Sequence, residues 1–558
     1  MEGDLGAKER RPRAVFMAFG TKGDVYPIAA LATAFACDQQ HYQVVLITHL
    51  AHQSLSAHLA CKNVTYMPIS SAPVLAAHQH DNISVGSEGE IPQSHVDQIS
   101  FSLRKKIIQK EHRQECLSAL EGVFGDDPSM EGDFIAINFF ALEGWHLAEL
   151  FQVECVITAP YLVPYSAPSS FERQFRQELP FLYKYFQEAP ANTVCWKDIA
   201  HWMWPLFMDN WGSWRSDCLN LSPVPFTDPV TNLPLWHMRA QSPLLLFYLF
   251  WNQLLREKGC LLTKGVTMTR YGFSKEIVEF PGYWPSNVYI CGFWFLPMEW
   301  QFSCHRCREI FRPNPYRSVI SMDRLCANHA ALQNFLMDSS RPCLPVFVGL
   351  NSIGSMGFLR NPQAFLMVLE AVVESTEYKF VLFSSGYKPL DATIQSIAGA
   401  SSKSAVLERA VCHEDSTFLF NDRLFCFSGT IPYSWLFPRC AVAVHHGGSG
   451  STAAALHAGI PQVVCPFLLD QFYWAERLCW LGVAPEPLQR QHLIPDDNDI
   501  SSINQAAGAL SRAIKMALSP EVKAQAANIA HRISSEDGIG EALKALKEKV
   551  IPPFNDGT

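Results

Sequence analysis

The sequence predicts an α/β protein made of two doubly wound halves, each with a mainly parallel sheet. Three observations lead to this expectation. The 558 residues suffice for two large domains. Short apolar runs that do not alternate with polar residues are typical of strands buried on both faces. A rhythm of strand, glycine-containing turn and helix opens the chain and starts again near residue 344.

The N-terminal half begins with a strand, a glycine turn, a helix and a second strand. Between residues 166 and 297 the periodicity is helical but interrupted by Pro and Trp. The expected elements are a strand at 14–19, a turn at 20–27, a helix at 28–37, and further strands at 44–48, 134–138 and 155–158.

The C-terminal half repeats the rhythm of strand and helix. Its expected strands cover 346–349, 379–384, 441–445 and 462–466, and its expected helices cover 363–375, 452–458 and the stretch after Pro520. We therefore divide the chain into a domain at 1–298, a connector at 299–342, a domain at 343–530 and a tail at 531–558. The tail is expected to form a helix that packs back on the first domain.

Composition narrows the functional classes. With 48% hydrophobic residues the chain can form packed cores, which excludes a mainly disordered protein. Its net charge of −9 argues against binding to nucleic acid. Ten of the 14 tryptophans lie between Trp196 and Trp300. They indicate either core and loop packing, or an apolar wall or interfacial belt for a flat lipid or a membrane.

We expect a cytoplasmic protein, because the first strand begins too early for a secretory signal and the longest apolar run, 243–251, is too short to span a membrane. An odd number of cysteines, 17, spread along the chain suits reduced thiols. The basic segment 103–113 is either a solvated helix face or a peripheral contact with anionic lipid on the cytosolic face of a membrane.

One cysteine cluster has the spacing of a metal site. Cys304 and Cys307 form one pair, and Cys326 and His329 form a second pair about twenty residues later. Two such pairs can bind a tetrahedral zinc ion. The alternative is that they are free thiols in the connector, because a long chain contains accidental Cys-x-x-Cys pairs.

The strongest motif is the segment 444–452, Val-His-His-Gly-Gly-Ser-Gly-Ser-Thr, which follows a strand and opens a helix. Glycines let a backbone approach an anion, and a helix N-terminus offers unpaired N–H groups and a partial positive charge. The order of residues fits neither a P-loop nor the dinucleotide fingerprint. The segment predicts either a diphosphate site or an ordinary glycine-rich turn.

A second motif follows the next strand. Asp470 and Gln471 stand at its carboxyl end, where ligands bind in open α/β sheets. A carboxylate beside an amide can bind neighbouring sugar hydroxyls. Asp470 also suits the role of a helix N-cap.

These motifs together resemble a known family. The segment from His445 to Pro461 and the following Pro-Phe-Leu-Leu-Asp-Gln from Pro466 resemble the donor signature of UDP-dependent glycosyltransferases, and among these the sterol 3-β-glucosyltransferases of the GT-B fold. The turn 20–27 is similar to the family's Gly-Thr-Arg-Gly-Asp-Val-Gln-Pro, and 281–293 resembles the end of its acceptor domain. The resemblance spans nearly the whole chain. It implies two Rossmann-like domains that face each other across a cleft. Compared with the fungal members of the family, this protein is expected to lack the large N-terminal membrane-binding extension.

The resemblance implies an inverting transfer of glucose from UDP-glucose to the 3-hydroxyl of a sterol, with no cofactor and no obligatory metal. Asp24 matches the family's general base, which would take the proton of the acceptor hydroxyl. Locally, Asp24 also suits a turn former or helix cap. His446 and the backbone N–H groups around it would stabilise the charge that develops on the leaving UDP.

The resemblance also implies binding residues. Those for the donor are Gly349, Ser352, His446, Gly448, Gly450, Ser451, Thr452, Asp470 and Gln471. Those for the acceptor are Gly23, Trp145 and His146, the last of which suits either packing or acceptor positioning.

Two segments depart from the family pattern. Gly349-Leu-Asn-Ser352 replaces Gly-Phe-Gly-Ser, and Pro432-Tyr-Ser-Trp435 replaces Pro-His-Asp-Trp. Other hypotheses therefore remain: a catalytically weak protein that binds sterol or nucleotide sugar, a transferase acting on a triterpenoid, steroidal alkaloid or other lipid, or a GT-B epimerase. The ligands that we expect are a UDP-sugar and a lipophilic acceptor.

Overall fold

The computed structural model describes residues 10–73, 93–125, 130–161, 167–189, 194–227, 269–279, 288–313, 324–338, 344–350, 352–402 and 415–551. The chain forms two compact units, and each is described by itself. The first unit consists of Met1–Pro73, Gln98–Phe295 and Asp537–Thr558, and the second of Val74–Asp97 and Leu296–Glu536. The described residues of the expected connector at 299–342 thus belong to the second unit.

The first unit contains a seven-stranded sheet in the order β3-β2-β1-β4-β5-β6-β7, with every pair of neighbours parallel. Its strands are β1 (Arg13–Met17), β2 (Gln43–His49), β3 (Val64–Ile69), β4 (Phe134–Ile137), β5 (Glu154–Ala159), β6 (Thr269–Tyr271) and β7 (Val288–Ile290). Its helices are α1 (Lys22–Asp38), α2 (Ser56–Ala60), most of α3 (Gln93–Phe124), α4 (Glu143–Phe151), α5 (Ser169–Glu178), α6 (Pro180–Gln187), α7 (Trp196–Asp198), α8 (Asp209–Cys218) and α20 (Gly538–Val550).

The first helix begins earlier than the sequence suggests. We expected a turn up to Pro27 and a helix from Ile28, but α1 starts at Lys22 and contains Pro27. Thr21 is the N-cap, and Asp24 in the first turn accepts a hydrogen bond from the Thr21 N–H at 2.6 Å. A proline removes one helical hydrogen bond. The capping contact secures the N-terminus of the helix despite this loss, and it places Asp24 inside the helix rather than in a loop.

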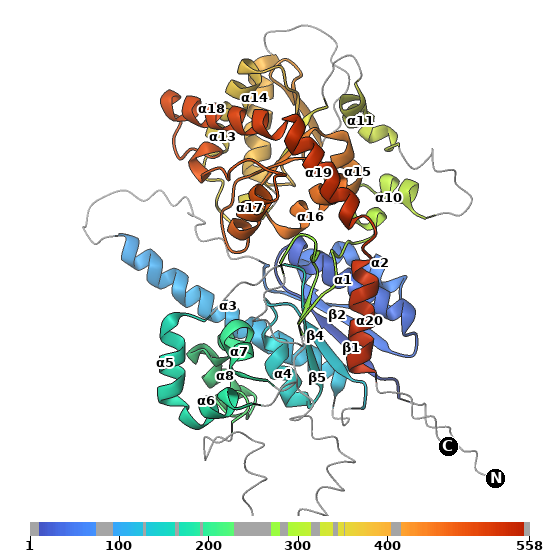
Figure 1. Cartoon of the computed structure of the whole chain (residues 1–558), viewed down its shortest axis with the longest axis vertical. Helices are drawn as coiled ribbons and strands as arrows, with labels where there is room; N and C mark the ends of the chain where they lie inside the picture. Colours follow the sequence, from blue (N-terminus) through green and yellow to red (C-terminus); the bar gives the residue numbers. More distant parts are fainter. Residues whose placement is uncertain are drawn as a thin grey trace, which may run out of the picture. The chain divides into compact units, whose positions relative to one another are not determined.

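The C-terminal helix α20 returns to the first unit, where it packs on α1 (Figure 1). Lys547 of α20 forms an ion pair with Asp38 at the end of α1, with 2.9 Å between Nζ and Oδ2. Leu546 is fully buried. The helix therefore covers part of the first sheet's helical layer, although almost all of the first unit's sequence lies more than 200 residues upstream.

The second unit contains a six-stranded sheet in the order β10-β11-β9-β8-β12-β13, parallel except for the hairpin of β10 and β11. Its strands are β8 (Val346–Gly349), β9 (Phe380–Phe383), β10 (Ser416–Leu419), β11 (Leu424–Phe427), β12 (Val442–His445) and β13 (Gln462–Val464). Its helices are α10 (His305–Phe311), α11 (Ala330–Met337), α12 (Ser352–Ser355), α13 (Pro362–Ser375), α14 (Lys388–Ser402), α15 (Tyr433–Leu436), α16 (Ser449–Ala458), α17 (Gln471–Trp480), α18 (Ile500–Ala517) and α19 (Pro520–Ile533).

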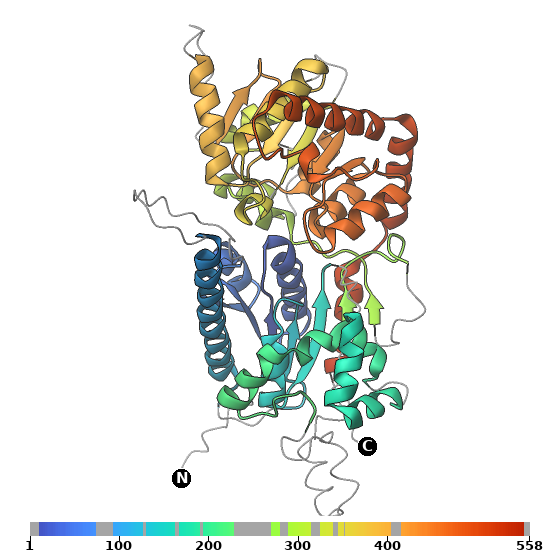
Figure 2. The same ribbon diagram turned by 90° about the vertical axis from the view of Figure 1, so that its left-hand side faces the viewer.

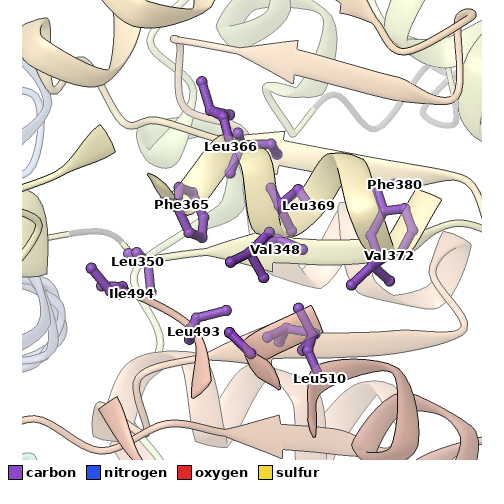
Figure 3. Close-up of a cluster of buried hydrophobic side chains, with 14 of the residues drawn as sticks. Val348, Leu350, Phe365, Leu366, Leu369, Val372, Phe380, Leu493, Ile494 and Leu510 are labelled. Atoms are coloured by element: carbon purple, nitrogen blue, oxygen red, sulfur yellow. The ribbon is translucent and has the colours of Figure 1, made fainter. Parts of the chain in front are cut away.

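Successive side chains of the central strands point to opposite faces of the sheet, and this divides the core of the second unit into two layers. Val346 and Val348 of β8 face a cluster formed with α13 and α18, whereas Phe347 between them belongs to a cluster with β11 and α15. Figure 3 shows the first layer, with Val348 beside Leu369 and Leu510 among its members. Helices therefore cover both faces of this sheet, as the two views in Figures 1 and 2 show. Burial on both faces explains the continuous apolar runs in the sequence.

The prediction of two parallel-sheet Rossmann-like domains is confirmed. Within the part of the chain that the structure describes, no helix combines the length and the apolar character needed to cross a membrane. The sequence did not reveal β3, β6, β7 or the β10–β11 hairpin. Three to six residues make up each of these strands, so they are too short to give a clear periodic signal.

Candidate active site

The candidate donor residues lie at the topological switch point of the second sheet. From β8 the chain continues to β9 on one side, and it returns to β12 on the other side of β8. His445 at the end of β12 pairs with Gly349 at the end of β8, and also with Val464 of β13. The turns that follow these three strands therefore meet at one edge of the sheet. Ligands of open α/β sheets bind at this kind of edge.

The turn between β12 and α16 presents a helix N-terminus at this edge. Gly448 is the N-cap, and α16 begins at Ser449, three residues earlier than the expected start at Thr452. The Thr452 N–H bonds to the Gly448 carbonyl oxygen at 3.0 Å. The N–H groups of residues 449–451 precede this first helical hydrogen bond. Gly450 is exposed, and a Cβ added to it would meet no atom within 4 Å, so an anion has room to approach.

His446 lies buried over this turn. A Cβ on Gly448 would come within 2.5 Å of its Nε2 atom, so the ring occupies its position only because residue 448 is glycine. Burial, and then the neighbouring His445, lower the pKa of His446 to about 3. The ring is therefore neutral at physiological pH in the unliganded protein. It can act as a hydrogen-bonding dipole but not as a protonated acid.

Two buried polar atoms at this turn lack partners among the described residues. They are Nδ1 of His446 and Oγ1 of Thr452. Buried polar atoms are usually hydrogen-bonded, and an unpaired one in a native structure calls for an explanation such as a ligand. A bound anion with associated hydroxyls could satisfy both atoms.

His445 positions the turn rather than facing a ligand. Its Nδ1 accepts a hydrogen bond from the Gly447 N–H at 3.0 Å, so Nε2 carries the proton and donates to Oε1 of Gln462 at 2.9 Å. The ring is completely buried. Gly447 has a positive φ of 84°, and a Cβ there would approach Val464 and the backbone of Gln471. Only glycine fits this close contact between the two loops.

Asp470 and Gln471 stand at the end of the loop after β13, as predicted. Asp470 is the N-cap residue of α17, and its Oδ2 accepts a hydrogen bond from the Trp474 indole at 3.0 Å. The Oε1 atom of Gln471 accepts hydrogen bonds from the Phe467 and Leu468 N–H groups at 2.9 and 3.2 Å. Gln471 thus holds the loop in shape, and only its amide nitrogen can bind a ligand as a donor.

Gly349 and Ser352 flank the turn after β8. A Cβ on Gly349 would come within 2.4 Å of the Phe347 ring, so this glycine is required by packing inside the sheet. Ser352 begins the short helix α12. Asn351, where the sequence departs from the family pattern, lies outside the described residues.

Asp24 lies at the corresponding switch point of the first sheet. The chain passes from β1 to β2 on one side, and β4 lies on the other side of β1. The Asp24 Oδ2 atom accepts hydrogen bonds from the N–H and the hydroxyl of Thr21 at 2.6 and 2.8 Å. Burial raises the pKa of Asp24 from 3.8 to about 6, although the Thr21 hydrogen bonds oppose this effect. A carboxylate with such a pKa is a stronger base than an exposed one.

The backbone around Asp24 is fixed by residues that the sequence analysis did not single out. Asn138, directly after β4, donates through Nδ2 to the Phe19 and Asp24 carbonyl oxygens at 2.8 and 3.3 Å. His52 donates through Nε2 to the Gly20 carbonyl oxygen at 3.0 Å. The only signal for Asn138 was an amide at the carboxyl end of a buried strand. His52 is far from the turn in sequence and gave no signal.

The proposed acceptor residues have different environments. Gly23 is exposed in the first turn of α1. Trp145 and His146 are buried on α4, where the His146 ring packs against Trp211 with 4.5 Å between ring centroids. His146 Nδ1 accepts a hydrogen bond from Arg215 at 2.9 Å, and its Nε2 is buried without a partner in the described part of the chain. The structure shows a packing role for His146. Acceptor contact by these residues stays a prediction.

Arg215 organises this region and was missed in the sequence. Its fully buried guanidinium forms two hydrogen bonds of 2.9 Å with the Glu149 carboxylate and one of 2.6 Å with the Ser222 carbonyl oxygen. The guanidinium carbon of the neighbouring Arg113 lies 4.1 Å from the Trp211 ring centroid and 5.3 Å from the Trp214 ring centroid. These tryptophans therefore contribute to packing within the first unit.

The basic segment 103–113 belongs to α3. Arg104, Lys105, Lys106 and the apolar Leu103 and Ile107 are all exposed. The exposure suits both a solvated face and a membrane contact, so the peripheral contact stays a prediction.

The cysteine cluster of the second unit is assembled as its spacing suggested. Cys304, Cys307, Cys326 and His329 place one ligand atom each within 4.8 Å of one another. They belong to the segment that precedes β8, and the His329 ring packs against Phe427, the last residue of β11. This cluster is considered separately below.

Comparisons with known proteins find similarity to glycosyltransferases. A family model described as the C-terminal domain of erythromycin biosynthesis protein CIII-like proteins matches residues 423–530. The chain is 22% identical over 548 residues to a sterol 3-β-glucosyltransferase of Arabidopsis thaliana. The match covers 97% of this chain and 69% of that protein. It is 23% identical to a sterol 3-β-glucosyltransferase of Saccharomyces cerevisiae, over 95% of this chain and 34% of the yeast protein.

Among solved structures, the chain is similar to a UDP-glucosyltransferase from Polygonum tinctorium described as capable of glucosylating indoxyl. The TM-score is 0.50 at 12% identity, over 98% of this chain and 100% of that structure. At this level of identity the likeness concerns the fold alone.

Proposed function

We propose that the chain is a divergent member of the sterol 3-β-glucosyltransferase family and that it transfers glucose from UDP-glucose to the 3-hydroxyl of a sterol or a similar lipophilic alcohol. The observation that carries the proposal is the edge of the second sheet at β8 and β12. There a buried neutral histidine precedes a helix N-terminus that contains an exposed glycine, and two buried polar atoms, His446 Nδ1 and Thr452 Oγ1, lack partners among the described residues. This arrangement suits a diphosphate.

The donor would bind through its diphosphate at the β12–α16 turn. The N–H groups of residues 449–451 and the hydroxyl of Thr452 offer hydrogen bonds to phosphate oxygens without any cationic side chain. His446 offers a further polar contact. Asp470 and the amide nitrogen of Gln471 stand at the same edge and suit the hydroxyls of the sugar. In an acidic protein, a helix N-terminus provides the favourable potential that a cluster of lysines would otherwise supply.

Asp24 would act as the general base. Its carboxylate removes the proton of the acceptor hydroxyl while the hydroxyl oxygen forms a bond to the anomeric carbon of the sugar. The bond between that carbon and the β-phosphate oxygen breaks, and its electron pair leaves with UDP. One displacement of this kind inverts the anomeric configuration. The N–H groups at the β12–α16 turn would stabilise the charge that develops on the leaving phosphate.

The acceptor is proposed to be a flat apolar alcohol because the relatives in Arabidopsis and yeast are sterol 3-β-glucosyltransferases. Triterpenoid, steroidal alkaloid and other lipid alcohols share these features. We infer a peripheral site of action at a lipid surface, where such acceptors are found, and the exposed basic and apolar residues of segment 103–113 support this inference.

The deciding experiment incubates the purified full-length chain with UDP-glucose and a panel of sterols and other lipid alcohols. Product mass identifies the acceptor and the sugar together, and UDP release gives the rate. We expect a hexosylated sterol and UDP in equal amounts. Tight binding of sterol or UDP-sugar without turnover would contradict the enzymatic proposal and favour a binding protein. UDP release without any acceptor product would indicate hydrolysis or another reaction.

A further inference from the structure

Four side chains outside the candidate active site converge in the segment that precedes β8. Cys304 Sγ lies 3.8 Å from Cys326 Sγ, and His329 Nδ1 lies 3.4 Å from Cys307 Sγ and 3.3 Å from Cys326 Sγ. Cys307, Cys326 and His329 are buried, and Cys304 is half-buried. Three thiols and an imidazole nitrogen thus surround one point.

Local structure explains how two short sequence pairs converge. Cys304 is the N-cap residue of α10, and Cys307 stands in the first turn of that helix. Cys326 is likewise the N-cap residue of a 3₁₀ turn, Ala327–His329, which His329 ends. A residue at the N-cap and one three positions later face each other across the start of a helix. Each pair is therefore preformed, and the fold has only to bring the two helix starts together.

The separations match a tetrahedral metal site. With Zn–S bonds of about 2.3 Å and Zn–N bonds of about 2.0–2.1 Å, tetrahedral ligands lie about 3.8 Å apart for two sulfurs and about 3.5 Å apart for a sulfur and a nitrogen. The observed distances of 3.8, 3.4 and 3.3 Å are close to these values. A disulfide would need the two sulfurs at about 2.05 Å. The described cysteines are all free thiols.

The surroundings support a bound ion. Cys304 stands at the N-terminus of α10, and Cys326 stands at the N-terminus of the Ala327–His329 turn. The partial positive charge at a helix N-terminus favours a thiolate. The opposite side of the cluster is apolar, since the His329 ring meets the Phe427 ring of β11 with 5.4 Å between centroids. Soft thiolates combined with imidazole favour zinc over magnesium or calcium.

We propose that Cys304, Cys307, Cys326 and His329 bind one structural zinc ion. All four tetrahedral positions are filled by the protein, so no position is left for a substrate or a catalytic water. The ion would fasten α10 and the Ala327–His329 turn to each other and to the second sheet. Cys307 and Cys326 share the core cluster that contains Phe425 and Phe427 of β11. The site is independent of the proposed transferase chemistry.

The first test measures metal content in the full-length chain, purified without chelator. We expect about one zinc per chain. Exchange with cobalt(II) is expected to give the visible d–d bands of a tetrahedral ion and thiolate-to-metal charge transfer in the near ultraviolet. A zinc content near zero together with no cobalt spectrum in the fully reduced chain would overturn the proposal. A disulfide between Cys304 and Cys326, seen by mass spectrometry of the purified protein, would overturn it as well.

Variants make the test specific. Cys307→Ser is expected to weaken metal binding by more than the ~10–100-fold typical for loss of an outer contact, and the cobalt spectrum should lose thiolate intensity. His329→Cys is expected to retain the ion with a fourth thiolate, whereas His329→Ala should not. Cys440→Ser is the matched control, because Cys440 is equally buried in the same core cluster but is not a ligand. Full metal content in a Cys307→Ser, His329→Ala double variant would contradict the assignment, even if that variant is less stable.

Discussion

At the scale of single residues, each unit contains a candidate functional residue whose burial is unfavourable for folding, and neighbouring groups hold it in place. Asp24 is held by Thr21, and its pKa is raised to about 6 by burial. His446 is buried with an unpaired Nδ1 over Gly448. A protein evolved for stability alone would avoid both features, and such conflicts are typical of functional sites.

The substitution Asp24→Asn separates the proposed role of Asp24 as general base from its structural role at the start of α1. Asparagine retains an oxygen that can accept the Thr21 hydrogen bonds, but it is not a base. We expect turnover to fall by about 10²–10⁴-fold, the usual contribution of general base catalysis, while the melting temperature at pH 8 stays the same or rises because a buried charge is removed. Initial rates and thermal denaturation measure the two effects. Asp38→Asn, at the other end of α1, is the control and should retain activity.

The pH dependence follows from the same carboxyl group. Asp24 must be ionised to accept a proton, so kcat/KM should decline as the pH falls through about 6. The contribution of Asp24 to the free energy of unfolding changes with pH in the opposite direction. Because the folded-state pKa is raised above the ordinary 3.8, the folded protein binds the proton more tightly, and this contribution to stability decreases as the pH rises from about 4 to about 6. A rate profile that stays flat down to pH 5 in an intact protein would contradict the role of Asp24.

At the scale of elements, the strand ends decide which residues can act together. The turns after β8, β12 and β13 meet because their strands are neighbours in parallel register. Likewise Asn138 after β4 reaches the turn after β1. Both edges are switch points of a doubly wound sheet. In this way Asn138 lies beside Phe19, 119 positions away in the sequence, and His445 lies beside Gly349 of β8.

Gly448→Ala tests the turn between β12 and α16. The new methyl group would meet Nε2 of His446 at 2.5 Å, so the ring must leave its place over the turn. We expect kcat/KM for the sugar donor to fall at least ~10-fold, since displacement of one contact commonly costs about 1–3 kcal/mol. Gly399→Ala in α14 is the control, because its added methyl meets no atom and should be neutral or stabilising. An unchanged donor KM and kcat in Gly448→Ala would contradict this account of the turn.

At the scale of the whole molecule, the chain does not divide simply into consecutive domains. The first unit is completed by α20 from the C-terminus, and the second unit includes the segment between Leu296 and Met337 that precedes its first strand. The first unit therefore depends on the last residues of the chain for its helical layer.

Leu546→Ala tests this dependence. Leu546 is fully buried where α20 packs against the first unit. Truncation of a buried leucine costs about 2–5 kcal/mol, so the unit that carries Asp24 should unfold at a lower temperature and activity should be lost on mild heating. Leu103→Ala is the matched control, because Leu103 is 60% exposed and its truncation should change the free energy of unfolding by less than about 0.5 kcal/mol. Differential scanning calorimetry measures whether the unfolding temperature of this unit is lowered. Equal melting profiles for the two variants would show that α20 does not stabilise the first unit.

The sequence by itself determined the fold class, which the structure confirms, and it predicted a donor motif. Strands buried on both faces appear as continuous apolar runs, and a glycine-rich turn before a helix is readable because its chemistry is contiguous. From these patterns and the family resemblance, the sequence predicted roles for Asp24, His446, Asp470 and Gln471.

Only the tertiary structure decided which distant residues support these motifs and what each side chain is engaged in. Asn138, His52 and Arg215 act through contacts that join separate elements, and such contacts leave no local pattern. The start of α1 also depended on a capping contact that outweighed the signal of Pro27. The spacing of the four candidate zinc ligands allowed either a metal site or separate free thiols. Only the fold shows that the two helix starts come together and bring the four side chains to one point. Sequence patterns record local periodicity and contiguous chemistry, whereas packing and burial depend on residues that are far apart along the chain.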